Sequence, residues 1–127
     1  MTAVVIREDS RAFCAGADLK EIAAGRGIDP TGHPEWGFAG LAQHWVSKPL
    51  IAAVNGPAKG GGAEIALACD LVVASEQAVF GLPEVKRGLL AGAGGVIRLQ
   101  RQIPVKLALQ MVLTGDPVPA VTALQWG

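Results

Sequence analysis

Apolar and polar positions follow two different periods along the chain. Residues 3–7 and 50–56 are short, nearly continuous apolar runs, and the second suits a strand buried on both faces. Between such runs, apolar residues recur at the spacing of one helix face. We therefore predict strands over 3–7, 50–56, 70–75 and 78–84, and helices over 18–25, 36–47, 62–69, 91–103, 104–115 and 121–127.

The order of these elements predicts the fold class. Strands alternate with helices through the chain, which is typical of a layered α/β protein with a mainly parallel sheet. Residues 26–35 are rich in glycine, proline and polar residues and are predicted to form a loop. Asp18 is a candidate N-cap and Gly25 a candidate stop for the helix between residues 18 and 25.

Composition narrows the possible partners. Eleven acidic residues balance eleven basic ones, so charge gives no argument for nucleic acid or for an anionic membrane surface. The apolar runs are far shorter than the ~20 residues of a membrane span. No charged and apolar leader pattern opens the chain. Cys14 and Cys69 lie in apolar contexts and are expected to be free, buried thiols of a cytoplasmic protein.

The glycine-rich stretch "KGGGAEIALACD" (59–70) does not fit the common nucleotide-binding motifs. Gly56 and Gly61 have the spacing of a P-loop, but Gly62 and Ala63 stand where lysine and serine or threonine are required. In "GAGGVI" (92–97), Ile97 occupies the third glycine position of the dinucleotide fingerprint. Nucleotide binding through either motif is therefore improbable.

Two explanations of these glycines stay open. Glycine permits positive φ angles and close backbone packing, which would be a structural role. Alternatively, the free N–H groups of a helix start can bind a carbonyl oxygen that becomes negative during a reaction, as a thioester does when it forms an enolate. Glu64 lies three residues after Gly61 and so shares its helix face. It would place a carboxylate beside such a carbonyl.

Three segments of the chain together resemble the enoyl-CoA hydratase, or crotonase, family. They are "AFCAGADLKE" (12–21), "KPLIAAVNGPAKGGGAEIALACDLVVAS" (48–75) and "FGLPEVKRGLLAGAGGVIRL" (80–99), in the order found in that family. The resemblance covers nearly the whole chain. It implies a crotonase-like α/β spiral of ββα units over residues 1–127.

The resemblance also implies an oxyanion site and a CoA site. The two backbone N–H donors to the thioester oxygen fall on Ala17 and Gly61. The CoA contacts fall on Ala17, Asp18, Leu19, Lys20 and Gly61. No metal or redox cofactor is implied, because CoA arrives as part of the acyl-CoA substrate.

Hydratases of this family use two glutamates, which correspond to Glu64 and Glu84. The implied reaction is reversible addition of water across the 2,3 double bond of a trans-2-enoyl-CoA. Glu84 would deliver a proton to Cα, while Glu64 would help remove one from the attacking water. Two neighbouring carboxyl groups do not both ionise easily, so a shared proton at neutral pH is reasonable.

Other functions of the same family stay open. An enoyl-CoA isomerase, a carnitinyl-CoA dehydratase and a catalytically inactive acyl-CoA-binding fragment all fit the sequence. Full members are about twice as long and form homotrimers or hexamers. The comparison with them predicts a fragment, without an N-terminal ββα region and the C-terminal trimerisation helices, whose apolar surface is exposed.

Overall fold

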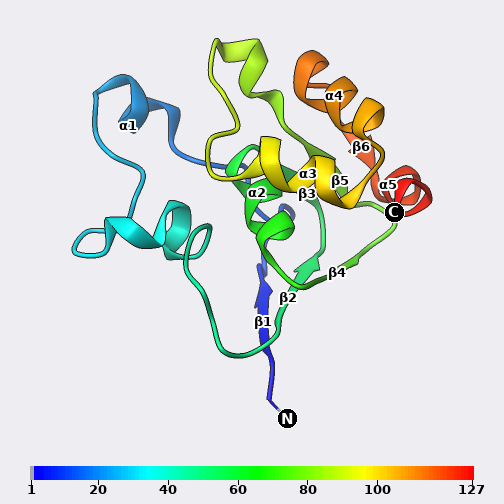
Figure 1. Ribbon diagram of the computed structural model, residues 1–127, viewed down its shortest axis with the longest axis horizontal. Helices are drawn as coiled ribbons and strands as arrows, with labels where there is room; N and C mark the ends of the chain where they lie inside the picture. Colours follow the sequence, from blue (N-terminus) through cyan, green and yellow to red (C-terminus); the bar gives the residue numbers. More distant parts are fainter. Residues whose placement is uncertain (1) are drawn as a thin grey trace.

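The computed structural model of the chain describes residues 2–127 (Figure 1). The strands are β1 (Val4–Arg7), β2 (Leu50–Val54), β3 (Pro57–Lys59), β4 (Leu71–Ala74), β5 (Val79–Gly81) and β6 (Val118–Pro119). The α-helices are α1 (Leu19–Ala23), α2 (Gly61–Ala68), α3 (Gly95–Gln102), α4 (Val105–Thr114) and α5 (Ala120–Trp126). The 3-10 helices are η1 (Pro34–Trp36), η2 (Phe38–Gly40) and η3 (Pro83–Arg87).

The described strands form two small sheets. One has the order β1-β2-β4 and is parallel throughout, with Val5 opposite Ile51 and Ala52 opposite Val72. The other has the order β3-β5-β6, in which β3 and β5 are parallel and β6 is antiparallel. The predicted strand–helix alternation and the mainly parallel arrangement are confirmed.

Strand β2 is the centre of the first core. Leu50, Ala52 and Val54 are buried on one face, and the residues between them are half-buried. Helix α2 packs on that buried face through Ile65 and Ala66. A second core joins α2, α3 and α4 around Leu82, Leu99 and Met111, among others. Helix α2 therefore lies between the two cores, which fixes its position firmly.

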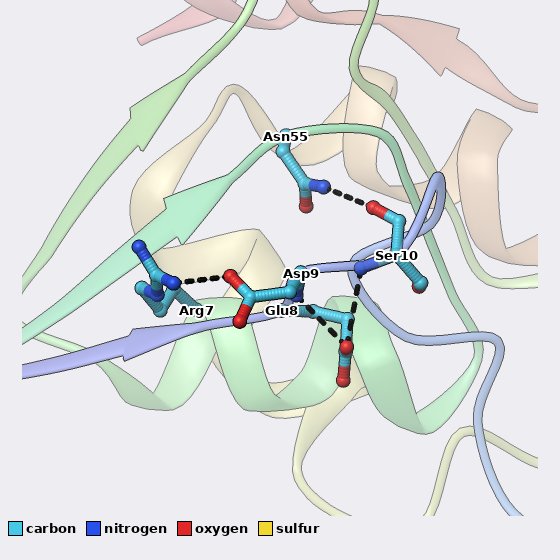
Figure 2. Close-up of polar contacts among 5 residues, drawn as sticks. All are labelled: Arg7, Glu8, Asp9, Ser10 and Asn55. Carbon is cyan, nitrogen blue, oxygen red and sulfur yellow. Dashed lines mark hydrogen bonds and ion pairs between the residues drawn. The ribbon is translucent and has the colours of Figure 1, made fainter.

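The chain after β1 is tied to the chain after β2. Asn55 donates its side-chain amide to the Ser10 carbonyl over 2.6 Å, and Glu8 accepts from the backbone N–H groups of Asp9 and Ser10 (Figure 2). Arg7 pairs with Asp9 at the end of the strand. These contacts fix the start of the segment that leads to residues 14–20.

The helix predicted over residues 36–47 is wrong. This segment forms η1, η2 and irregular turns, because Gly37 and Gly40 adopt positive φ angles of 69° and 68°. Ala39 has a φ of 58°, which is uncommon for a residue with a side chain. Backbone at these angles cannot continue a right-handed helix, so the apolar spacing of the segment serves irregular packing instead.

Several large apolar side chains are exposed, as predicted from the resemblance to a family whose full members are about twice as long. On β4, Leu71 and Val73 are 58% and 65% exposed, and on α5 Leu124 is 82% exposed. Cys14 is a half-buried free thiol and Cys69 a buried one. Within residues 2–127, every helix is too short or too polar to cross a bilayer.

Candidate active site

Helix α2 begins at the glycine triplet and buries a carboxyl group. Gly60 is the N-cap and has a φ of 56°, so this position favours glycine. The Glu64 N–H donates to the Gly60 carbonyl over 3.1 Å, closing the first turn. The Glu64 side chain is only 4% exposed, which is rare for a carboxyl group.

The start of α2 lies directly against the segment around Cys14. A Cβ on Gly62 would lie 2.1 Å from the Cys14 carbonyl oxygen, and a Cβ on Gly16 would lie 3.0 Å from the Gly61 nitrogen. Glycine is therefore required for two backbones to approach each other. This close packing is the structural role left open by the sequence, and it brings the neighbourhoods of Ala17 and Gly61 together.

Neither predicted oxyanion donor has a backbone acceptor. Within residues 2–127, the N–H groups of Ala17 and Gly61 donate to no backbone carbonyl. Gly61 is the first residue of α2, where a free N–H and the positive end of the helix dipole coincide. The Phe38 ring covers the Gly61 Cα, since a Cβ there would lie 2.3 Å from Phe38 Cε1.

The predicted CoA-contact residues lie at the start of α1. Asp18 is the N-cap, as predicted, and its carboxylate accepts from the Lys20 N–H over 2.8 Å. Leu19 is 48% exposed, and Lys20 is also exposed. Their contact with CoA stays a prediction.

Glu84 lies against Gly60, the N-cap residue of α2. It follows Pro83 in η3, and its Oε1 would lie 3.2 Å from a Cβ on Gly60. Its Oε2 is buried, and no donor within the described part of the chain reaches that atom. Glu84 also lies close enough for its charge to act on Glu64, so the structure brings together two glutamates that are twenty positions apart in the sequence.

Both carboxyl groups are held towards the protonated form. Burial raises the pKa of Glu64, and the Glu84 charge raises it further, while the N–H groups of Gly95 and Ala93 and the Arg98 charge lower it by less. Burial also raises the pKa of Glu84. A pair of this kind is suited to holding one proton between two carboxyl groups.

The sequence analysis missed the residues that hold Glu64 in place. The Gly95 N–H donates to Glu64 Oε1 over 2.9 Å, from the first residue of α3. Arg98, one turn further on, bonds the Ala93 carbonyl with Nη1 over 3.1 Å and the Ala42 carbonyl with Nη2 over 2.5 Å. The glycine-led start of this second helix was the available signal, but nothing in the pattern paired it with Glu64.

Comparison with known proteins identifies the family of the chain. The family model described as enoyl-CoA hydratase/isomerase matches residues 1–127. The carnitinyl-CoA dehydratase of Proteus mirabilis (strain HI4320) is 43% identical over 126 residues, which are 98% of this chain and 48% of the relative. The chain thus spans about half the length of the curated relatives it matches.

Solved structures resemble the chain closely. A carnitinyl-CoA dehydratase from Mycobacterium avium 104 superposes with a TM-score of 0.95 at 58% identity, covering 98% of this chain and 49% of the other. An enoyl-CoA hydratase from Mycobacterium tuberculosis H37Rv has a TM-score of 0.88 at 45% identity, covering 98% and 48%. The predicted crotonase-like α/β fold is confirmed, with about half of a full-length fold represented.

Proposed function

The chain belongs to the enoyl-CoA hydratase/isomerase family, and we propose that Glu64 and Glu84 catalyse reversible hydration of a 2-enoyl-CoA thioester. The observation that carries the proposal is the convergence of two carboxyl groups with raised pKa values beside the free N–H at the start of α2. A single buried carboxyl group is compatible with a structural role, such as capping a helix. Two beside an unpaired helix start favour acid–base chemistry on a carbonyl compound.

In the proposed reaction, water adds across the double bond with Glu64 as base. The water oxygen bonds to Cβ while its proton passes to the Glu64 carboxylate. The π electrons move towards the thioester, whose oxygen becomes negative and accepts N–H bonds from Ala17 and Gly61. Glu84 then gives its proton to Cα, and dehydration is the same path in reverse. In comparable sites, each such N–H donor lowers the activation barrier by about 2.7–4 kcal/mol.

The surroundings of the two carboxyl groups support this division of work. Glu64 accepts an N–H bond from Gly95 and lies near the Arg98 charge, and both favour its ionised form. Glu84 Oε2 has no donor among the described residues, which disfavours a negative charge there. On this contrast we assign the shared proton to Glu84 and the ionised form to Glu64 as part of the proposal.

A carnitinyl-CoA thioester is a second candidate substrate. Solved structures of a carnitinyl-CoA dehydratase and a carnitinyl-CoA hydratase are 58% and 61% identical to this chain, above the 45% of the enoyl-CoA hydratase. Its dehydration would use the same two glutamates in the reverse direction. We further expect CoA to contact Ala17, Asp18, Leu19, Lys20 and Gly61, with a homotrimer or hexamer as the assembly.

Turnover of two thioesters tests the proposal. The chain is mixed with crotonyl-CoA or with the dehydrated product of carnitinyl-CoA, and loss of the enoyl-thioester absorbance is followed. We expect turnover with at least one of them, lost in Glu64→Gln and Glu84→Gln and retained in Glu35→Gln, whose carboxyl group is exposed. A product with a shifted double bond identifies an isomerase instead. A folded chain that converts neither compound refutes the proposal for these 127 residues.

A further inference from the structure

Arg98 joins two segments that meet beside Glu64. Its guanidinium bonds the Ala93 carbonyl, which belongs to the glycine turn before α3, and the Ala42 carbonyl, which belongs to the chain after η2. Ala42 is fully buried. A planar guanidinium can hold two acceptors at fixed angles, which an ammonium group cannot. The side chain therefore fixes the turn relative to its surroundings.

The guanidinium also lies directly over the turn. Gly94 has a φ of 108°, and a Cβ there would lie 1.9 Å from Arg98 Nη1. The Arg98 backbone N–H donates to the Gly94 carbonyl over 2.8 Å, so backbone and side chain hold the same residue. The next residue is Gly95, whose N–H donates to Glu64 Oε1. The turn thus connects Arg98 with Glu64 through the Gly95 N–H.

We propose that Arg98 is a positioning residue for Glu64: it holds the Ala93–Gly95 turn so that the Gly95 N–H stays on the carboxylate. The inference rests on the proposed function only in giving Glu64 the part of base. The positioning itself is a property of the folded chain and can be measured without substrate.

The charges around Glu64 make the electrostatic part testable. Burial has the largest influence on the pKa of Glu64. Among its neighbours, Arg98 acts from α3, Glu84 acts from η3, and the Gly95 and Ala93 N–H groups donate to it. Removing Arg98 removes a charge that favours the Glu64 carboxylate and loosens the N–H donors. Both changes disfavour the carboxylate, so we expect the pKa of Glu64 to rise.

The experiment measures the Glu64 carboxyl group directly by NMR. Protein labelled with ¹³C at the glutamate carboxyl carbons is titrated, with Glu64→Gln used for assignment, and exchange of the Gly95 N–H is followed alongside. Arg98→Gln removes the charge and both bonds, while Arg98→Lys keeps the charge and loses the paired geometry. Arg101→Gln is the matched control, because it removes an exposed charge from the same helix.

We expect Arg98→Gln to raise the pKa of Glu64 and to speed exchange of the Gly95 N–H at least tenfold. Arg98→Lys should speed exchange while shifting the pKa less, and Arg101→Gln should change neither. Where turnover is present, kcat should fall about tenfold in Arg98→Gln with KM within about twofold. Unchanged pKa and exchange in folded Arg98→Gln or Arg98→Lys overturns the inference, and so does an equal shift in Arg101→Gln. If the unmodified chain shows no turnover but the Arg98 variants show these changes in pKa and exchange, only the proposed function is refuted.

Discussion

Substituting Gly95 with alanine should displace the Glu64 carboxyl group and lower kcat, while leaving the fold intact. A Cβ on this residue would lie 2.9 Å from Glu64 Oε1 and 3.0 Å from the Ala91 Cβ, whereas ordinary contact begins at 3.4 Å. The Gly95 backbone is part of α3 and cannot easily shift. The Glu64 carboxyl group must therefore move away by roughly 0.5 Å. This movement lengthens the 2.9 Å hydrogen bond that the Gly95 N–H donates to Glu64. The hydrogen bond favours the ionised form of Glu64, so its lengthening disfavours that form.

The expected effect is about a tenfold loss of kcat. Misplacement of a catalytic group by about 1 Å can cost about 100-fold, so half that displacement corresponds to roughly tenfold, or about 1.4 kcal/mol of barrier. Stability should change little. Alanine favours a helix over glycine by up to about 1 kcal/mol, which offsets part of the crowding. Thermal unfolding, followed by circular dichroism, should show a Tm within a few degrees of the unmodified chain.

Gly92→Ala provides the matched control. It adds the same methyl group in the same glycine-rich stretch, but its Cβ would meet only the Leu90 carbonyl oxygen, at 3.7 Å. Gly92→Ala should keep full turnover of the enoyl-thioester. Equal activity of the Gly95 and Gly92 variants would refute the argument that Gly95 sets the position of Glu64, and so would an equal loss in both.

Three further predictions follow from the same site. Glu64→Gln should stabilise the chain at pH 7 by about 1 kcal/mol, because a buried carboxyl with a raised pKa opposes folding once ionised; the difference should vanish in urea unfolding as pH falls below the ordinary glutamate value. Glu84→Gln should lower kcat at least 100-fold, and residual turnover should no longer decline on the alkaline side of the pH profile, because the group whose proton is lost there is gone. Gly62→Ala should lower Tm by on the order of 10 °C in a thermal scan, since its Cβ would lie 2.1 Å from the Cys14 carbonyl oxygen, and Gly92→Ala again serves as the unaffected comparison.

The regular elements of the fold could be predicted because their patterns are local. Strand β2 is a short apolar run and α2 an apolar helical pattern behind glycine, and both lie within one or two residues of the predicted positions. β3 and β6 escaped prediction because three and two residues are too few to show a period. Helix α3 begins at Gly95 and not at residue 91, because the left-handed Gly94 cannot lie inside a helix.

The site was predictable only in part, for a related reason. Glu64 and Glu84 could be identified from short segments with a recognisable family pattern. The bonds that hold Glu64 join residues 31 positions apart, and the Arg98–Ala42 bond spans 56 positions. The segment that supplies the Ala42 carbonyl is the one whose predicted helix was wrong. A contact that depends on an irregular backbone leaves no periodic trace in the sequence.

The site combines two identical side chains with opposite surroundings. Glu64 is almost fully buried, and its charge is compensated by a backbone N–H and a nearby guanidinium. Glu84 is only half-buried, yet one of its oxygens is buried with no donor among the described residues. Burial raises the pKa of both groups, but among the described residues only Glu64 has N–H donors and a guanidinium that oppose this rise. A base and an acid that work at the same pH require surroundings that differ in this way. Gly60 and Gly95 are therefore part of the proposed chemistry, because a Cβ would crowd Glu84 Oε1 at 3.2 Å in the first position and Glu64 Oε1 at 2.9 Å in the second.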